Sequence, residues 1–142
     1  AFITHNDEFQ MKENKTGIEN LITTVQRLRG PEGCPWDMKQ SVPSLQKYVA
    51  EECAEIQAAI SNHDTRNLCE ELGDFLYLII MLAEISSDEG HFCFADVVAS
   101  ITEKLIRRHP HVFVEKVELD DETLRKQWQE IKRLEKKTTK KP

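Results

Sequence analysis

Two short acidic clusters constrain the fold of this chain more than any other feature of its sequence. They are Glu51-Glu52-Cys-Ala-Glu55 and Glu71-Leu-Gly-Asp74, about twenty residues apart, and each lies in a segment of helical periodicity. Each cluster pairs acids three positions apart, and residues three or four apart share one face of a helix. Two such helices side by side would bring four carboxylates together. Because carboxylates held close repel one another and lose hydration, a cation is expected among them.

The first cluster belongs to a helix predicted over residues 42–61, with Ser41 as its candidate N-cap. At about 100° per residue, the apolar side chains of this helix form one broad arc made of Leu45, Tyr48, Val49, Ile56, Ala59 and Ile60. Glu52 falls inside the arc, Glu55 lies at its edge and Glu51 lies farther out. A solvated run of charges would lie opposite the apolar side chains, so the pattern favours an inward-facing Glu52.

The second cluster belongs to a helix predicted over residues 66–86. From Phe75 onward this helix is apolar nearly all round, which marks it as the most buried element of the chain. In helical projection, Glu71 and Asp74 continue an apolar row made of Leu78, Met81 and Ile85. Both clusters therefore place acids on a face that should be buried.

Three further helices are predicted from the spacing of apolar residues, over 17–30, 94–108 and 121–135. The stretch 30–37, which is rich in glycine and proline, is predicted to be a loop, and 112–119 a connector that could be extended. No internal repeat and no β-hairpin signal is present. The expected fold class is therefore all-α, a helical bundle of about four to five helices.

The two ends of the chain lack this periodicity. Residues 1–16 are polar and are expected to form a flexible leader, with Met11 a candidate natural start after an expression remnant. Residues 136–142, KKTTKKP, are basic and unpatterned and are expected to be disordered. The segment between them, 17–135, is long enough for one domain with its own core.

Charge and cysteine content narrow the function classes. The formal net charge of −6 argues against general binding to nucleic acid, which needs a broad basic surface. A small ligand bearing phosphate remains compatible with it if cations compensate locally. The longest apolar run, 75–83, is too short to cross a bilayer, so no membrane partner is expected. No N-terminal signal pattern of charged and then apolar residues is present, so a cytoplasmic location is the default expectation. The four cysteines show no C-x-x-C spacing, which favours reduced thiols.

The acids predict the kind of cation. Inward carboxylates without a His or Cys pair favour Mg²⁺, with Mn²⁺ as a substitute, because hard cations prefer oxygen ligands. Calcium is less expected, since no loop rich in Asp and Asn is present. The alternative is that the acids are exposed helix charges, some of them paired with basic residues.

Basic and aromatic residues supply what an anionic, aromatic ligand would need. Lys104 and Arg108 are four residues apart, as are Trp128 and Lys132. Alternatively, Lys104 and Arg108 are solvated charges on a helix surface, and Trp128 is a core residue. Trp36, in the predicted loop, either plugs the core or stacks on a ligand. His109 and His111 flank Pro110 at a helix C-terminus, where a capping role is expected.

Four segments together resemble one known family. They are LRGPEGCPWDMKQSVPSLQKYVAEECAEIQAAI, EELGDFLYLIIMLAEI, KLIRRHPHVF and QWQEIK. In this order they resemble the MazG family of nucleoside triphosphate pyrophosphohydrolases over about residues 18–133. The family's E-E-x-x-E and E-x-x-D elements match the two acidic clusters in register.

This resemblance implies Mg²⁺-dependent cleavage of a (d)NTP between its α and β phosphorus atoms, to (d)NMP and pyrophosphate, for clearance of the nucleotide pool. It implies a homodimer or a higher homo-oligomer. By position, it assigns metal binding to Glu52, Glu55, Glu71 and Asp74. It makes Glu51 the candidate base that orients or deprotonates the attacking water.

The same resemblance assigns nucleotide binding to Lys104, Arg108, Trp128 and Lys132, with Trp36 as a weaker candidate. Two rivals stay open beside it. One is an enzyme of the same architecture, phosphoribosyl-ATP pyrophosphatase, although the C-P-W-D loop and the R-H-P-H-V-F string favour the MazG side. The other is a non-catalytic nucleotide-binding protein that keeps the fold.

Overall fold

The chain is all-α, as its periodicity predicts. A computed structural model describes residues 16–139, and these residues contain helices and no strand. The predicted leader therefore lies outside the described residues except for Thr16. Seven helices, α2 to α8, are present in this part of the chain instead of the four to five that were expected. The two additional helices, α3 and α7, are each one short turn begun by a proline.

The described residues belong to two compact units, 1–94 and 95–142. The first unit contains α2 (Gly17–Arg29), α3 (Pro35–Lys39), α4 (Val42–Ser61) and α5 (Thr65–Asp88). Helix α4 begins at a capping box in which the hydroxyls of Ser41 and Ser44 each accept a backbone N–H from the other residue. Helix α5 begins at Asp64, whose carboxylate accepts the backbone N–H of Asn67. These caps set the starting points of the two helices that carry the acidic clusters.

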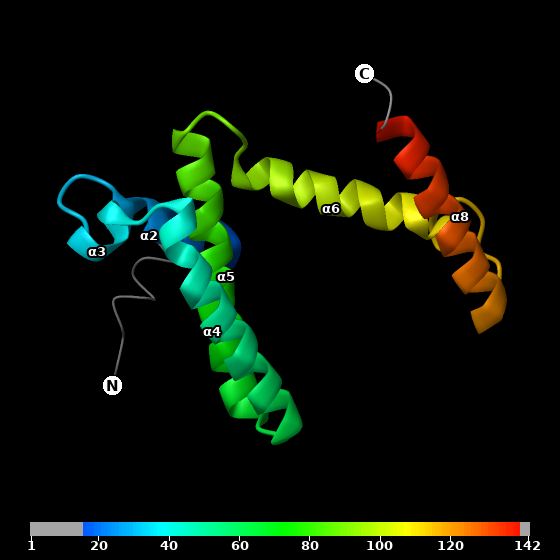
Figure 1. Cartoon of the computed structure of the whole chain (residues 1–142), viewed down its shortest axis with the longest axis horizontal. Helices are drawn as coiled ribbons and strands as arrows, with labels where there is room; N and C mark the ends of the chain where they lie inside the picture. The colour runs from blue at the N-terminus through cyan, green and yellow to red at the C-terminus, as the bar shows by residue number, and fades with distance from the viewer. Residues whose placement is uncertain (1–15, 140–142) are drawn as a thin grey trace. The chain divides into compact units, whose positions relative to one another are not determined.

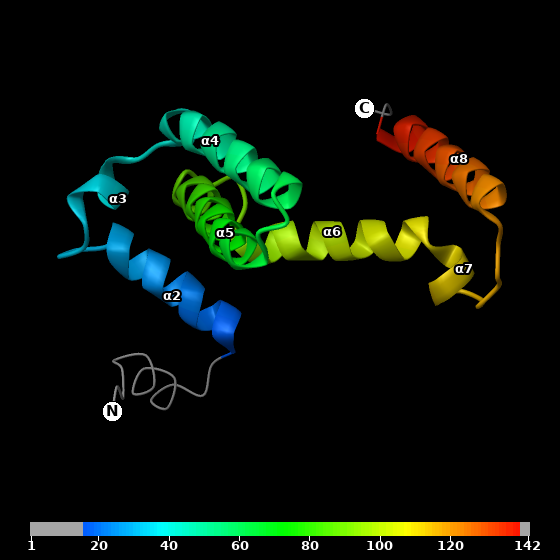
Figure 2. The ribbon, with the colours of Figure 1, turned by 90° about the horizontal axis from the view of Figure 1, so that it is seen from below.

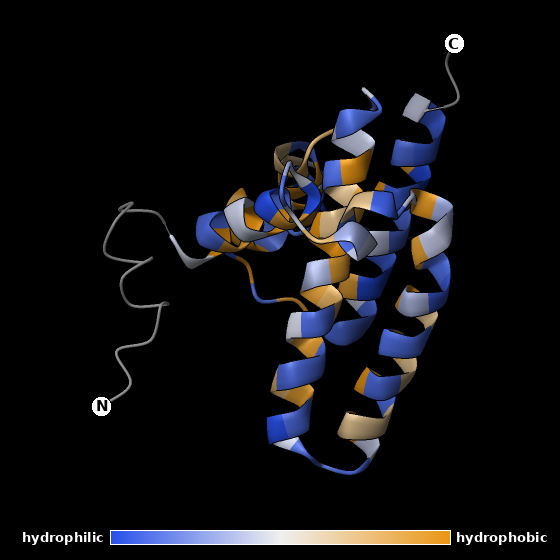
Figure 3. Cartoon of the chain, turned by 90° about the vertical axis from the view of Figure 1, so that its left-hand side faces the viewer, coloured by the Kyte–Doolittle hydropathy of each residue, from blue (hydrophilic) through white to orange (hydrophobic). Residues whose placement is uncertain are grey.

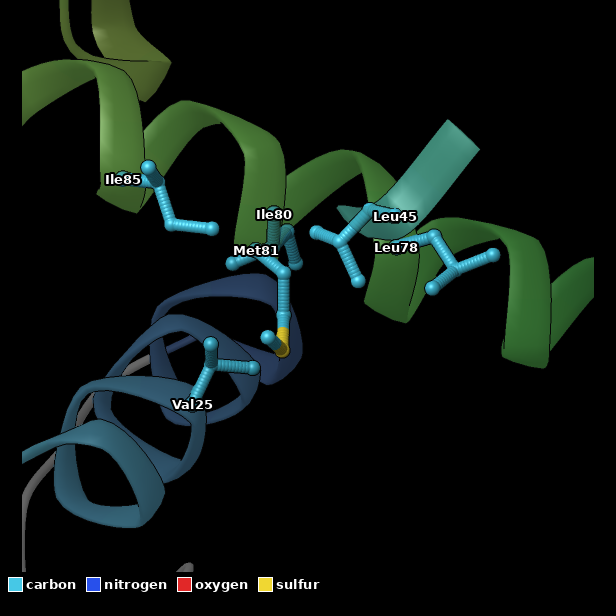
Figure 4. Packing of buried hydrophobic residues seen from close by; sticks show 6 residues of the cluster. All are labelled: Val25, Leu45, Leu78, Ile80, Met81 and Ile85. Carbon is cyan, nitrogen blue, oxygen red and sulfur yellow. The ribbon is translucent and has the colours of Figure 1, made fainter. Parts of the chain in front are cut away.

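The core of the first unit is built around α5. Helices α4 and α5 lie side by side along most of their length (Figure 1, Figure 2), and α2 also packs on α5. Figure 4 shows Val25 of α2 pointing toward Met81 of α5, with Leu45 of α4 beside them. These three side chains are fully buried. Full burial of a Val, Leu or Met side chain contributes about 1.5–3 kcal/mol each, so this cluster fixes the register of α4 against α5.

The loop prediction for 30–37 is wrong at its C-terminal end. Pro35 begins the short helix α3, where its fixed φ and missing N–H suit the first helical position. Gly33 lies at the tight bend before it, because a Cβ there would come within 2.2 Å of the carbonyl oxygen of Leu28. Helix α3 packs against α2.

The second unit contains α6 (Phe94–Arg108), α7 (Pro110–Phe113) and α8 (Asp121–Thr139). Residues 112 and 113 belong to α7, so the connector to α8 is shorter than predicted and covers residues 114–120. The expected disordered tail is also wrong for residues 136–139, which continue α8. Lys136 and Lys137 favour these last turns because their positive charges complement the helix dipole. Residues 140–142 lie outside the described part of the chain.

Apolar and polar residues alternate around the helices, as Figure 3 shows. Within residues 16–139, no helix is both long and apolar enough to cross a membrane. No disulfide joins the four cysteines within the described residues; Cys34 and Cys93 are half-buried, and Cys53 and Cys69 are exposed.

Candidate functional site

Three carboxylates from two helices meet in the first unit. Glu52 and Glu55 come from α4 and Glu71 comes from α5. One carboxylate oxygen of each residue lies within 4.8 Å of those of the other two. Within the described residues, no other group of three or more His, Cys, Asp or Glu side chains comes together in this way. The cluster follows from the packing of α4 on α5, which turns the inward acids of both helices to one point.

Two oxygens of this cluster have no partner. Oε2 of Glu52 and Oε2 of Glu71 are both buried, and neither accepts a hydrogen bond from any described residue. A buried carboxylate oxygen that has lost water and gained no donor costs free energy. Either a shared proton or a cation would satisfy both oxygens at once. The donor set therefore fits a hard divalent cation with oxygen ligands.

The acids raise one another's affinity for protons. Burial raises the pKa of Glu52, and the negative charges of Glu55 and Asp74 raise it further. A hydrogen bond shared with Glu71, together with the charge of Glu71, raises the pKa of Glu55. For Glu71, the hydrogen bond shared with Glu55 lowers the pKa, but the contact with Glu52, burial and the charges of Glu52 and Asp74 raise it by more. Two carboxylates share such a bond only when one of them holds a proton.

The other two acids of the sequence clusters, Asp74 and Glu51, do not belong to this group of three. Asp74 is exposed and lies outside the group of three, so the prediction that it shares a buried face with Glu71 is wrong. Its negative charge nevertheless raises the pKa values of all three acids. Glu51 is exposed one residue before Glu52. This placement agrees with the helical projection, which sets Glu51 outside the apolar arc.

A buried contact that the sequence did not reveal holds α3 beside this unit's core. Asp37 is almost fully buried and accepts a hydrogen bond from the hydroxyl of Tyr77 on α5. Arg29 donates from Nη1 to the Asp37 carbonyl oxygen at 2.6 Å. Burial and the bonded, negatively charged Asp37 raise the pKa of the Tyr77 hydroxyl. No periodicity links residues 37 and 77, so only the packed structure shows this contact.

Trp36 is fixed by the same short helix. Its ring contacts the ring of Tyr48 edge-on, with centroids 5.3 Å apart, and it packs against the core cluster. Trp36 also lines a hollow of about 710 Å³ whose rim carries Lys39 and Lys47. The core contact agrees with one of the two alternatives for Trp36, and stacking on a ligand stays a prediction.

In the second unit, Lys104, Arg108 and Trp128 line one pocket of about 570 Å³. Trp128 is about half exposed within the described chain. Nζ of Lys132 lies 5.3 Å from the centroid of the Trp128 ring, within the range of a cation–π contact. The fold thus brings together the four residues that sequence spacing placed in pairs. Arg125, which no sequence pattern singled out, lines the pocket as well.

The guanidinium of Arg108 has a partner inside the unit. Glu135 of α8 accepts from Nε of Arg108 at 3.1 Å and from Nη2 at 3.2 Å, and it also accepts from Nε of Arg107 at 3.3 Å. These arginines lower the pKa of Glu135 to about 2. The sequence held a signal for this residue, because Glu135 continues the apolar row of Trp128 and Ile131 at helical spacing.

The two histidines differ in their contacts. Nδ1 of His109 lies 2.5 Å from the carbonyl oxygen of Leu105, so it donates there and caps α6 as predicted. His111 instead pairs through Nδ1 with the side chain of Gln127, at 3.0 Å. Both histidines line the pocket of Lys104 and Arg108.

Comparison with known proteins identifies the family. The family model for the MazG nucleotide pyrophosphohydrolase domain matches residues 40–113, about half of the chain. The chain belongs to the MazG family. This segment runs from the start of α4 to the end of α7, so it contains both acidic clusters, Lys104 and Arg108. Trp128 and Lys132 lie beyond it on α8.

Individual relatives agree with this assignment. The chain is 43% identical over 126 residues to the nucleoside triphosphate pyrophosphohydrolase/pyrophosphatase MazG of Thermotoga maritima, covering 89% of this chain and 48% of the relative. It is 41% identical over 116 residues to the nucleoside triphosphate pyrophosphohydrolase of Escherichia coli, covering 81% of this chain and 44% of the relative. It is 46% identical over 132 residues to the uncharacterised protein YabN of Bacillus subtilis, covering 91% of this chain and 27% of YabN.

The MazG chain thus spans about a quarter to a half of the length of these curated relatives. Among solved structures, it matches that of a MazG-related protein from Thermotoga maritima with a TM-score of 0.70 and 30% identity. That match covers 81% of this chain and 98% of the other. The fold is therefore shared over nearly the whole of a solved MazG-related chain.

Proposed function

We propose that this chain hydrolyses nucleoside triphosphates at the bond between the α and β phosphorus atoms, releasing (d)NMP and pyrophosphate. The observation that carries the proposal is the cluster of Glu52, Glu55 and Glu71, with its two buried oxygens lacking a partner. Membership of the MazG family and the names of two relatives support the substrate class. We take the domain responsible to span residues 17–135, and its role to be clearance of the nucleotide pool.

Mg²⁺ is the proposed cofactor, with Mn²⁺ as a substitute. Glu52, Glu55 and Glu71 would hold it, and Asp74 would complete the ligand set from the edge of the cluster. Carboxylates that bind Mg²⁺ commonly leave positions for substrate phosphates. When bound, the ion supplies charge neutralisation for the phosphate oxygens and activation of water.

Glu51 is the proposed base toward the attacking water. It is exposed, next to a metal ligand on α4 and one helical turn after Lys47, so water can reach its carboxylate. Removal of a positioned general base commonly lowers the rate by about 10²–10⁴-fold.

Nucleotide binding is proposed for the residues of the second unit's pocket. Lys104 and Arg108 would contact phosphate oxygens, and Trp128 with Lys132 would contact the base or ribose. Their joint presence in and beside one pocket supports these roles. Trp36, which has an accessible edge beside Lys39 and Lys47, remains the weaker candidate for substrate contact.

A homodimer or a higher homo-oligomer is the proposed assembly. Helix α6 contains no buried residue, although it carries an apolar row of Val97, Val98, Ile101, Leu105 and Ile106. Exposed apolar area of this kind is typical of a surface that another chain covers. The partner proposed here is a second copy of this chain.

The experiment is product analysis with a substrate panel. The panel contains normal and modified (d)NTPs and phosphoribosyl-ATP, each incubated with and without Mg²⁺. The proposal predicts nucleoside monophosphate and pyrophosphate in a 1:1 ratio with Mg²⁺ only. Preference for phosphoribosyl-ATP would favour the related enzyme class. Tight Mg²⁺-dependent binding without pyrophosphate would favour a non-catalytic nucleotide-binding protein.

A further inference from the structure

We propose that Glu135 is a positioning residue that aims the guanidinium of Arg108 at the phosphate groups of the substrate. This inference rests on the proposed function, since it concerns an arginine to which that function assigns phosphate binding. Glu135 itself is not expected to touch the substrate. It acts through Arg108.

The hydrogen bonds define which edge of the guanidinium is used. Glu135 engages Arg108 through two parallel bonds, from Nε and Nη2. Such paired bonds between the planar guanidinium and the planar carboxylate fix orientation as well as distance. Nη1 of Arg108 makes no hydrogen bond to any described residue, so it remains available to a ligand.

The two residues face different spaces. Arg108 lines the pocket that also contains Lys104 and Trp128. Glu135 does not line that pocket but a neighbouring hollow of about 520 Å³, together with Arg107 and Pro110. The Glu135 carboxylate therefore binds the guanidinium from outside the pocket. It adds no negative charge to the lining of the pocket where phosphate would bind.

The pair is well placed to be rigid. The Arg108 and Glu135 side chains are only about one-fifth exposed, at 21% and 20%. The other Glu–Arg pair of α8, Glu130 with Arg133, is about half exposed, at 55% and 51%. An arginine left without an anchor must lose side-chain freedom when it binds phosphate, whereas an anchored one has already lost it. Substrate binding is where this difference should appear.

A purely structural role for Glu135 is the competing explanation. Glu135 joins α8 to the end of α6 through both Arg107 and Arg108, so its loss could loosen the unit as a whole. The two explanations differ in one respect. A positioning role requires Arg108, whereas general loosening weakens nucleotide binding with or without Arg108.

The test is a double-mutant cycle on the full chain. The probe is the Mg²⁺ complex of a nucleoside triphosphate analogue with a methylene group between the α and β phosphorus atoms, made from the triphosphate that the substrate panel shows to be turned over fastest. Its Kd is measured for wild type, Glu135→Gln, Arg108→Ala and the double variant. Glu130→Gln is the matched control, since it removes the other Glu–Arg pair of the same helix.

Arg108→Ala should raise the Kd for the probe about tenfold or more, because a hydrogen bond to a charged group is lost. Glu135→Gln should raise this Kd about tenfold. The KM for the parent triphosphate should rise with Kd, while kcat changes less. In the Arg108→Ala background, Glu135→Gln should add nothing, and Glu130→Gln should bind as wild type does. Unchanged binding by Glu135→Gln, an equal loss in both backgrounds, or no effect of Arg108→Ala would each overturn the inference.

A measurement on the unaltered protein covers the case in which Glu135→Gln does not fold. The ¹⁵Nε–¹H signal of Arg108 should show a slowly exchanging, hydrogen-bonded proton both with and without the probe. Loss of that protection on probe binding would contradict a positioning role, because it would mean that phosphate displaces Glu135. If wild type neither binds the probe nor releases pyrophosphate, the proposed function itself has failed. If wild type does both and only the cycle fails, the failure is confined to this inference.

Discussion

Glu52 of α4 and Glu71 of α5 face each other across two adjacent helices, and each buries a carboxylate oxygen that no described residue satisfies. In the absence of a cation, the like charges repel each other, and the buried oxygens have lost water without gaining a hydrogen-bond donor. A divalent ion would relieve both. Binding of one cation by these carboxylates should therefore account for the metal dependence of both stability and activity.

The first prediction concerns stability with and without Mg²⁺. Glu55→Gln should raise the Tm in EDTA, because one of the mutually repelling charges is removed. Mg²⁺ should raise the Tm of wild type and should raise that of Glu55→Gln by less, because a ligand is missing. Glu70→Gln, which removes an exposed acid of α5, is the control and should respond to Mg²⁺ as wild type does. Thermal unfolding over a range of Mg²⁺ concentrations provides the measurement.

The second prediction concerns protons. The pKa values of Glu52, Glu55 and Glu71 are raised in the metal-free chain, and a metal binds the deprotonated carboxylates. Lowering the pH toward these raised pKa values should therefore weaken Mg²⁺ binding, and binding in that range should release protons. Calorimetry in two buffers of different ionisation enthalpy measures the release. A Mg²⁺ affinity that is independent of pH down to the ordinary pKa of glutamate would contradict this prediction.

The third prediction concerns the contact between α3 and α5. Tyr77→Phe removes the hydroxyl that donates to buried Asp37 and should lower the free energy of unfolding by about 1–3 kcal/mol. Tyr48→Phe is the control, because the Tyr48 hydroxyl has no hydrogen-bond partner among the described residues. Urea unfolding, compared through the midpoint and the m value, measures both variants. Equal effects of the two substitutions would show that the Asp37 contact carries no special weight.

The fourth prediction concerns acid stability. The pKa of Glu135 is lowered to about 2, first by its hydrogen bonds to Arg108 and Arg107. A lowered pKa in the folded state means that the charged form stabilises the fold at pH values above the ordinary pKa of glutamate, about 4.3. This contribution should be lost as the pH falls from there toward about 2. Wild type should therefore exceed Glu135→Gln in stability at pH 6, and the difference should shrink toward zero at pH 2. A constant difference across this range would contradict the assignment.

The helices could be predicted from the sequence because their signals are local. Apolar spacing and the cap at Ser41 are properties of neighbouring residues, and α4 begins at Val42 as expected. The inward direction of Glu52 could also be predicted, since it follows from helical periodicity alone. That Glu52 lies close to Glu71 could not be predicted in the same way, because it depends on the packing of α4 on α5.

Other features could not be predicted, because they depend on contacts between distant residues or on short turns. The pairing of Asp37 with Tyr77 spans forty residues, and no periodicity connects them. Helices α3 and α7 are too short to show an apolar repeat, and each of them begins at a proline. The role of Glu135 depends on Arg108, which lies on a different helix.

The most direct test of the central claim compares two neighbouring acids of α5. Glu71→Gln removes a carboxylate of the proposed metal site, and Glu70→Gln removes an exposed carboxylate one position earlier. Pyrophosphate release from the best triphosphate is measured against Mg²⁺ concentration for both folded variants. We predict that Glu71→Gln lowers Mg²⁺-dependent kcat/KM by about 100-fold and that Glu70→Gln matches wild type. Full activity in folded Glu71→Gln would contradict the metal site.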